Sequence, residues 1–325
     1  MKKILKKVIK FIYSSTLFDL FLTPFVFIAA LLFWMVRRIG FKHLKMTKRV
    51  LLKVGVIPIR NHYYEPLFDA KNLSKPLSDE RDLPGIVWNT EEQLQILDSF
   101  NYADEFTPIP DEYQDDLIFN FDNGSFIAGD AEYLYNIIRL RKPKRIVEIG
   151  SGNSTKIARL AVLANKRESA LYHCEHLCIE PYEMQWLEKL GIEIIRKKVE
   201  DNNQHIFDKL EAGDLLFIDS SHMIRPQGDV LYEFLELLPT LKKGVIVHIH
   251  DIFSPRDYLE SWVTGEIRLW NEQYLLEAFL TSNSDWKIIG SVNFLRHNHY
   301  DKLKAKCPRL TKDSEPGSFY IEKIN

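Results

Sequence analysis

The feature that most constrains the fold is an alternation of strand-like and helix-like segments that begins at Asp130 and continues to the end of the chain. Short apolar runs alternate with longer segments in which apolar residues recur at helical spacing. Such alternation is typical of α/β proteins, in which helices cover both faces of a mostly parallel sheet. Strands are predicted at 145–150, 177–181, 192–198, 214–221, 244–251, 286–292 and 318–324. Helices are predicted at 130–141, 154–165, 182–191, 228–244 and 269–281, with a short one within 203–213.

The amino terminus predicts a membrane-associated helix. Its first ten residues contain five lysines, the run from Leu20 to Val36 is uncharged, and six Lys or Arg residues lie between Arg37 and Arg49. This uncharged run is borderline in length, because a spanning helix needs roughly 20 apolar residues. Three interpretations stay open: a single span, a re-entrant or interfacial helix with both ends in the cytoplasm, and a buried helix. The basic downstream flank argues against a cleaved signal peptide, and basic flanks suit anionic lipid headgroups.

The domain organisation follows from these changes in composition. Residues 1–49 form a basic segment with an apolar core at 20–36, and residues 50–129 are rich in Pro, Asn and Asp. We expect this second part to be irregular, except for a helix near 90–100 that is capped by Thr90. Its stretch "RNHYYEP" is either a lid over the site or an ordinary packed loop. Residues 130–325 form the α/β domain, with Asp130 as the expected cap of its first helix.

Bulk composition excludes some classes of protein. A formal net charge of −2 argues against a protein that coats nucleic acid. Three cysteines do not make a disulfide framework, so a reducing compartment is the simpler interpretation. The run "HCEHLC" (173–178) lacks the spacing and the second half of a standard zinc motif, so we expect no zinc there.

A glycine-rich turn, "VEIGSGNST", follows the first predicted strand. In doubly wound sheets, ligands bind at the carboxyl ends of the strands, where glycines allow close approach and a helix presents free N–H groups. The third position of a dinucleotide fingerprint is occupied by Thr155, so that match is incomplete. Glu148 would repel a pyrophosphate but suits a cationic ligand or an amino group. A tight turn without any ligand is the structural alternative.

Polar residues end the two central strands. Asp219 and His222 follow the fourth strand, and His250 and Asp251 end the fifth. Neighbouring strands lie about 4.8 Å apart, so these four side chains should converge at one edge of the sheet. His248 shares a face with His250 if the strand is regular. We expect His250 to be the functional one, because it is nearer the edge.

The pattern E-x-G-x-G of the turn resembles the first motif of class I S-adenosylmethionine-dependent methyltransferases. The later stretches "CIEP", "VEDN", "AGDLLFIDSSH" and "GVIVHIHDIF" are similar to the other motifs of that superfamily, so the resemblance covers about 130–324. Together with "HYYEPLF" and "WNEQYLL", they resemble a bacterial branch, the methyltransferase-24-type proteins, often met among surface-polysaccharide genes. The resemblance implies a doubly wound, Rossmann-like, seven-stranded sheet with an antiparallel last strand.

The resemblance also implies S-adenosylmethionine as cofactor, with Glu180 at its ribose and the loop 199–202 at its adenine. The cofactor-binding residues implied in this way are Glu148, Gly150, Ser151, Gly152, Ser154, Glu180, Glu200 and Asp219. Its sulfonium end would meet the polar edge, where His222, His250 and Asp251 are the predicted catalytic residues.

Two catalytic roles stay open for that edge. A histidine could act as the base that takes a proton from an acceptor hydroxyl. Alternatively, Asp219, His250 and Asp251 could hold a divalent cation, as in some sugar and catechol O-methyltransferases that the chain resembles. A histidine ligand disfavours Mg²⁺ and leaves Mn²⁺, Fe²⁺ or Zn²⁺ open. A third, structural interpretation is that the histidines bond only to loop backbone.

The expected function is therefore methylation of a sugar or glycolipid hydroxyl at the cytoplasmic face of the bacterial inner membrane. Trp270, Asn271 and Tyr274 would shape an acceptor pocket or pack in the core. Membrane lipid is an expected partner, nucleic acid is not, and homo-oligomerisation stays open. The alternatives are a membrane-docked cofactor-binding scaffold without catalysis and an NAD-dependent oxidoreductase on a Rossmann-like fold.

Overall fold

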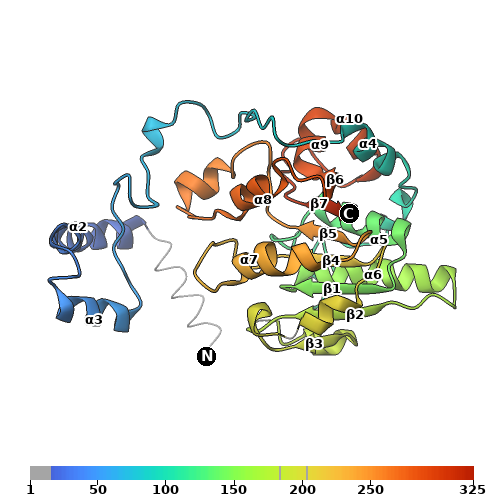
Figure 1. Ribbon diagram of the computed structural model, residues 1–325, viewed down its shortest axis with the longest axis horizontal. Helices are drawn as coiled ribbons and strands as arrows, with labels where there is room; N and C mark the ends of the chain where they lie inside the picture. Colours follow the sequence, from blue (N-terminus) through green and yellow to red (C-terminus); the bar gives the residue numbers. More distant parts are fainter. Residues whose placement is uncertain (1–15, 183, 203) are drawn as a thin grey trace. The chain divides into compact units, whose positions relative to one another are not determined.

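The computed structural model describes residues 16–182, 184–202 and 204–325 (Figure 1). The chain divides into two compact units, Met1–Ser74 and Lys75–Asn325. The lysine-rich segment predicted at the amino terminus lies outside the described residues. The division after Ser74 differs from the boundary expected between residues 129 and 130, because residues 75–129 belong to the same compact unit as the sheet.

The first unit contains a long apolar helix. Helix α2 spans Thr16–Ile39. The short helix α3 (Lys45–Val54) and then the 3₁₀ turn η1 (Ala70–Asn72) follow it in the chain. No residue of α2 is buried, and its most apolar stretch has a mean hydropathy of 2.2. By length and composition, α2 can cross a membrane.

The second unit is built on a seven-stranded sheet with the strand order β3-β2-β1-β4-β5-β7-β6. All neighbouring strands are parallel except β7, which runs antiparallel to both β5 and β6. The prediction of a mostly parallel sheet with an antiparallel last strand is confirmed. The strands are β1 (Arg145–Ile149), β2 (Glu175–Ile179), β3 (Glu193–Ile195), β4 (Leu215–Ile218), β5 (Ile246–Ile249), β6 (Trp286–Ser291) and β7 (Phe319–Lys323).

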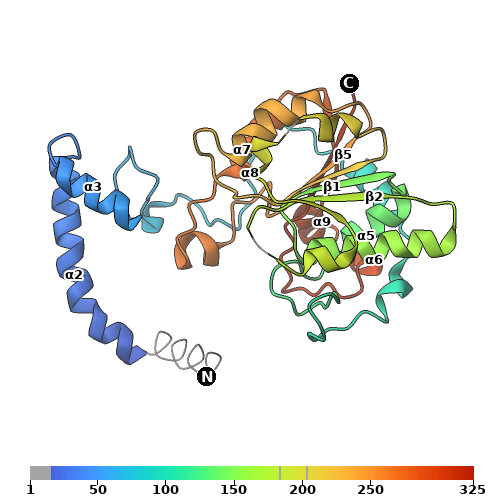
Figure 2. The ribbon, with the colours of Figure 1, turned by 90° about the horizontal axis from the view of Figure 1, so that it is seen from below.

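Helices cover both faces of this sheet, and each face has its own core cluster (Figure 2). One face packs on α4 (Thr90–Asp98), α5 (Asp130–Arg141), α6 (Asn153–Glu168), α9 (Val292–Asn298) and α10 (Tyr300–Lys306). The other packs on α7 (Asp229–Tyr232) with its continuations η6 (Glu233–Leu237) and η7 (Leu238–Thr240), and on α8 (Glu272–Leu280). The short elements η2 (Ala103–Phe106), η3 (Leu187–Leu190), η4 (Val199–Asp201), η5 (Gln204–Lys209) and η8 (Ser261–Gly265) lie in the connections.

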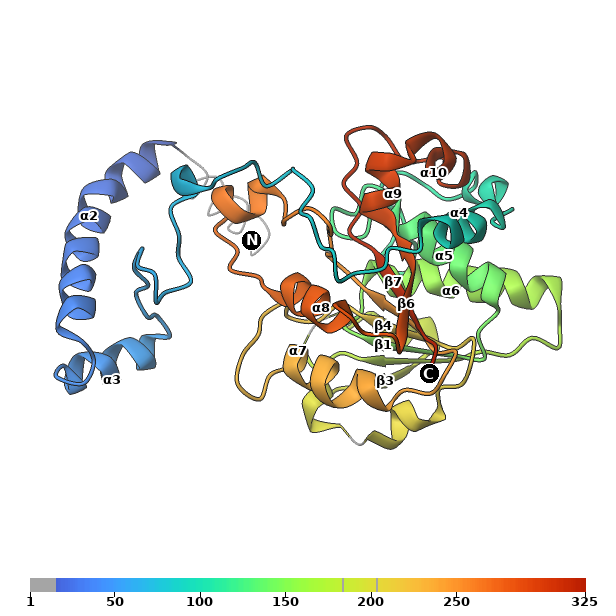
Figure 3. The same cartoon turned by 45° about the horizontal axis from the view of Figure 1, so that its top comes forward.

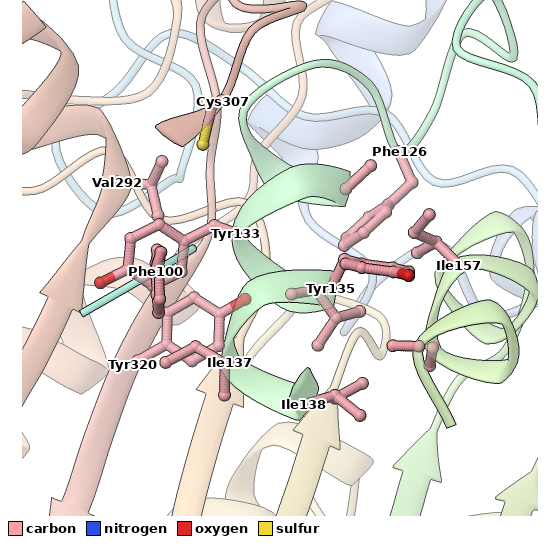
Figure 4. Close-up of a cluster of buried hydrophobic side chains, with 14 of the residues drawn as sticks. Phe100, Phe126, Tyr133, Tyr135, Ile137, Ile138, Ile157, Val292, Cys307 and Tyr320 are labelled. Carbon is pink, nitrogen blue, oxygen red and sulfur yellow. The ribbon is translucent and has the colours of Figure 1, made fainter. Parts of the chain in front are cut away.

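The mostly irregular segment 75–129 completes the first of these cores. Phe100 packs edge-on against Tyr133 of α5, and Tyr133 in turn contacts Tyr320 of β7 (Figure 4). Phe106 and Phe126 are also buried. In Figure 3, α4 lies beside α9 and α10, on the side of the sheet that α5 covers. Burial of these aromatic rings is what joins the segment to the α/β domain.

Three local predictions differ from the structure. The helix expected at 182–191 is reduced to η3, and Met184, with φ +58°, is in the left-handed region, which interrupts an α-helix. Asn89, not Thr90, is the N-cap of α4. Asp130 does not cap α5: its carboxylate accepts hydrogen bonds from the backbone N–H groups of Gly317 and Ser318, just before β7.

Candidate active site

The polar edge of the sheet is held together by its backbone ladder. The N–H of Gly150 donates to the carbonyl of Ile179, that of Asp219 to Ile149, and that of His250 to Ile218, at 2.8 to 3.0 Å. These bonds extend the parallel pairing one residue past the strand ends. They place the glycine turn, Asp219 and His250 side by side, as the carboxyl ends of adjacent parallel strands require.

The two glycines of the turn differ in the space around them: only glycine fits at one position, and a side chain would have room at the other. Gly150 has φ +78°, and a Cβ there would lie 2.0 Å from the carbonyl oxygen of Asp219. A Cβ on Gly152 would meet no atom within 4 Å. Only glycine therefore fits at position 150, whereas Gly152, the N-cap of α6, leaves space above the turn.

Glu148 lies behind this turn and stabilises it. Its carboxylate accepts a 2.7 Å hydrogen bond from Thr155 and lies 2.5 Å from Nε2 of His176. Thr155 in turn accepts a hydrogen bond from the N–H of Gly152, and Ser154 lies 3.4 Å from the same carboxylate. The predicted cofactor contacts of Glu148 and Ser154 stay predictions, because both side chains are buried within this network. Glu148, His176 and Cys178 bring their ligand atoms within 4.8 Å of one another, but Glu148 is already satisfied by Thr155 and His176.

A cavity of about 350 Å³ opens in front of the turn. Predicted cofactor residues from four different strand ends line it, namely Gly150, Glu180, Glu200 and Asp219. One carboxylate oxygen of Glu180 accepts a hydrogen bond from the N–H of Tyr182, which orients the carboxylate. Ser151 and Gly152 are half-buried residues of the adjacent turn.

His222 is the centre of the polar cluster. Its Nδ1 lies 2.8 Å from Oε2 of Glu272, and its Nε2 lies 3.3 Å from Oδ1 of Asp219 and 3.4 Å from Oδ2 of Asp251. The backbone carbonyl of His222 accepts hydrogen bonds from the N–H groups of Asn271 and Glu272, at the start of α8. Side chain and backbone are thus both attached to the same helix terminus, so the imidazole is held in one orientation.

The charges of the cluster depend on one another. Burial lowers the pKa of His222, but the hydrogen bonds to Asp219 and Glu272 outweigh it and raise the pKa to about 10. Burial raises the pKa of Asp219, but the adjacent charges of His250 and His222 hold it well below its usual range. Burial raises the pKa of Asp251 and of Glu272. Without a bound cation, His222 therefore carries a proton at neutral pH and has no lone pair for another.

His250 and His248 have different surroundings. Nδ1 of His250 lies 3.4 Å from Asp251 and 3.7 Å from Asp219, and the charges of these carboxylates raise its pKa well above the usual value in spite of burial. His248 is stacked on Tyr320 at 4.5 Å between ring centroids, and burial lowers its pKa. His250 thus lies beside Asp219 and Asp251, whereas His248 packs against Tyr320, and the functional role expected for His250 stays a prediction.

The structure brings together three potential metal ligands at the edge. Asp219, His222 and Asp251 each offer a ligand atom, and these atoms lie within 4.8 Å of one another. The predicted set contained His250 in the place of His222. His222 is better oriented for such a role, because its Nε2 faces both carboxylates while Glu272 accepts a hydrogen bond from its Nδ1–H.

An aromatic cluster lies against His222. The Trp270 ring is 4.2 Å from the imidazole and 5.3 Å from Trp262, measured between centroids. The guanidinium of Arg268 lies over both indoles, at 4.2 and 4.6 Å. Trp262, Arg268 and Trp270 are half-buried, so this cluster remains partly accessible.

Asn271 and Tyr274, for which an acceptor pocket and core packing were both left open, have contacts within the protein. Asn271 accepts a hydrogen bond from the N–H of Ile224, and the hydroxyl of Tyr274 lies 3.1 Å from a carboxylate oxygen of Asp257.

Sequence reasoning missed two buried acids beside the cluster. Glu272 is fully buried and pairs with His222. Glu233 is also fully buried, and one of its oxygens accepts a hydrogen bond from Ser220, next to Asp219. Each lies on a predicted helix that begins near the active edge. An acidic residue on the buried face of such a helix is unusual, and this could have identified both residues from the sequence.

Comparisons with known proteins point to a methyltransferase domain. A family model described as "Methyltransferase domain", of the methyltransferase-24 type, matches residues 147–252. An uncharacterized protein of Archaeoglobus fulgidus is 33% identical over 175 residues, which cover 49% of this chain and 76% of that protein.

Two solved structures show a weaker likeness. An O-methyltransferase from Bacillus cereus in complex with SAH is 11% identical, with 72% of this chain and 91% of that chain covered and a TM-score of 0.36. The TDP-rhamnose 3′-O-methyltransferase CalS11 is 12% identical, with 74% and 99% covered and a TM-score of 0.35. Scores this low carry no argument about the acceptor.

Proposed function

The chain belongs to the class I S-adenosylmethionine-dependent methyltransferase superfamily, and from this premise we propose that it methylates a hydroxyl oxygen of a sugar or glycolipid at a membrane surface. The observation that carries the proposal is the position of Asp219. Its side chain lines the cavity in front of the glycine turn and also belongs to the polar cluster around His222. Cofactor and acceptor would therefore meet at this residue.

The residues at the turn fit the cofactor. Space is left above Gly152, the N-cap of α6, and the first N–H groups of a helix have no partner within the helix, so a ligand in this space could bond to them. Gly150, Glu180, Glu200 and Asp219 would hold the cofactor in the cavity, with Glu180 at the ribose. When bound, S-adenosylmethionine supplies an electrophilic methyl group on a sulfonium. The protein's contribution is to position the acceptor oxygen and to exclude water from it.

The ligand geometry of the cluster favours a metal-assisted reaction, and its charges disfavour a histidine base. A protonated His222 cannot accept the acceptor's proton, and the same holds for His250, the pKa of which is also raised. Asp219, His222 and Asp251 have the donor types and the spacing to hold a divalent cation, and their mixed set favours Mn²⁺ or Fe²⁺ over Mg²⁺. A cation there would lower the pKa of a hydroxyl next to it.

The aromatic cluster supports a sugar as the acceptor. Indole rings stack on the apolar faces of sugar rings, and Trp262 and Trp270 are half-buried beside His222. The guanidinium of Arg268 between them adds hydrogen-bond donors for hydroxyl or phosphate oxygens. The exposed apolar surface of α2 supports the membrane as the place where such an acceptor is met.

Calorimetric titration of S-adenosylmethionine into the full-length protein in detergent tests the cofactor, with NAD as the comparison ligand. We expect micromolar binding that is lost in Gly152→Arg, because the added side chain enters the open space above the turn. Leu171→Arg is the matched control, since Leu171 is 96% exposed and an arginine there should leave binding unchanged. No binding by the folded wild-type protein would refute the cofactor assignment.

A non-catalytic scaffold is the competing interpretation. A substitution in the polar cluster distinguishes an enzyme from a scaffold. Methyl transfer to a panel of sugar and glycolipid acceptors, with and without Mn²⁺, should fall at least tenfold in Asp251→Asn, while cofactor binding is retained. A scaffold would show no transfer in the wild-type protein under any of these conditions.

A further inference from the structure

Helix α3 has an apolar stripe that the protein itself leaves uncovered. Met46, Val50 and Val54 lie four residues apart and therefore on one face of the helix. Their exposed fractions are 70%, 60% and 70%. The helix ends at Gly55, whose left-handed conformation lets its N–H bond to the carbonyl of Leu51. This stripe ends together with the helix.

The rest of α3 explains why the stripe is not part of a core. Leu51 is buried and Thr47 is half-buried one turn before it, so these two face the first unit. The helix also has four exposed basic residues, namely Lys45, Lys48, Arg49 and Lys53. The guanidinium of Arg49 lies 3.9 Å from the sulfur of Met46, at the border of the stripe. Within residues 16–74, which are the described part of the first unit, α3 is thus a basic amphipathic helix with an uncovered apolar stripe.

We propose that α3 binds flat in the headgroup region of a bilayer that contains anionic phospholipids. The stripe would face the acyl chains, and the four basic side chains would reach the lipid phosphates. The proposal rests on the membrane placement of α2 given above. Only residues 40–44 separate the two helices, and five residues span at most about 18 Å even when fully extended. Where α2 crosses a bilayer, α3 must therefore begin at the bilayer surface.

Charge decides between an anionic bilayer and a neutral one. Each Lys or Arg near an anionic membrane strengthens binding by about fivefold. Four such residues on one short helix make its binding depend strongly on the lipid charge and on salt. The apolar stripe alone, with three side chains, would give only weak and charge-independent binding.

The test places a probe on the stripe of the full-length chain. Val50→Cys, in a Cys174→Ser background, is labelled with an environment-sensitive fluorophore; Cys178 and Cys307 are buried and should not react. The protein is reconstituted into vesicles of phosphatidylcholine with or without phosphatidylglycerol. We expect a blue-shifted emission and at least fivefold protection from iodide quenching with phosphatidylglycerol. A probe at Leu171→Cys, in the second unit, should stay accessible to iodide throughout.

Charge reversal of α3 completes the test. The variant Lys45→Glu, Lys48→Glu, Arg49→Glu, Lys53→Glu should still float with the vesicles, while its probe becomes as accessible as the control. A wild-type chain that floats with a probe equally open to iodide in all vesicles would overturn the α3 proposal alone. A chain that does not float at all would overturn the membrane placement as well. Concentration-dependent protection in detergent, without vesicles, would assign the stripe to a second copy of the chain and likewise overturn the proposal.

Discussion

The glycine turn offers a sharp test, because two glycines two residues apart are predicted to respond very differently to the same change. In Gly150→Ala, the new Cβ would lie 2.0 Å from the carbonyl oxygen of Asp219, and the residue must keep φ near +78°. In Gly152→Ala, the new Cβ would meet no atom within 4 Å. The pair therefore separates a steric requirement of the fold from an opening for a ligand.

The magnitude follows from two contributions. A left-handed alanine costs about 1–2 kcal/mol, and relief of the clash requires a shift of the end of β4, which we place at a further 1–3 kcal/mol by analogy with overpacked cores. The sum, about 2–5 kcal/mol, corresponds to a lowering of Tm by roughly 4–20 °C for a domain of this size. Gly152→Ala should cost less than about 1 kcal/mol.

The assay is thermal unfolding of the full-length protein in detergent, followed by circular dichroism, with Mn²⁺ binding measured on the folded variants. Gly150→Ala should also weaken Mn²⁺ binding, because the carbonyl that must move belongs to the proposed ligand Asp219. If the two variants unfold within 1 °C of each other, the steric argument is wrong and the turn is not packed against Asp219 as described.

Three further predictions concern buried acids and the aromatic cluster. Glu272→Gln should weaken Mn²⁺ binding by roughly 10–100-fold, since the carboxyl group that orients His222 is lost. Glu233→Gln changes a buried carboxyl group that bonds to Ser220, and it should leave the affinity within threefold. Equal affinities of the two variants in calorimetry would contradict this role of Glu272. Burial raises the pKa of Glu132 to about 7, so the folded state holds this proton more tightly than the unfolded state. The stabilising contribution of this group should accordingly be full below pH 4.5 and be lost, by about 3 kcal/mol, as pH rises through 7. Denaturant titrations should show this loss in the wild type and not in Glu132→Gln. Trp262→Ala should raise KM for a sugar acceptor about tenfold with little change in cofactor affinity; an unchanged KM would remove the aromatic cluster from the acceptor site.

Much of the α/β architecture is readable in the chain because it is encoded locally. Strand-length apolar runs alternate with helical periodicities, and each run carries its own signal irrespective of distant residues. The same holds for the polar edge: parallel strands end at one edge, so Asp219, His222, His250 and Asp251 could be expected together before any contact was known. The glycine turn between β1 and α6 can likewise be predicted from the local sequence.

The tertiary structure decided what depends on residues far apart in the sequence. The chain after β2 does not form the helix that periodicity predicts: Met184 has a left-handed φ of +58°, and the guanidinium of Arg196 bonds to the carbonyls of Glu180 and Met184 from beyond β3. Asp130 has the form of a helix cap but bonds to the backbone before β7, because the sheet brings that loop beside it.

The roles within the site were decided in the same way. Glu272, 50 residues after His222, helps to set the orientation and charge of that histidine, and this charge disfavours His222 as a general base. A residue's type and spacing are local properties, whereas its pKa and its partners depend on burial and on charges that only the folded chain brings within a few ångströms. The sequence by itself therefore determined where the candidate site lies in the α/β pattern, and the fold decided which partners and charges its residues have.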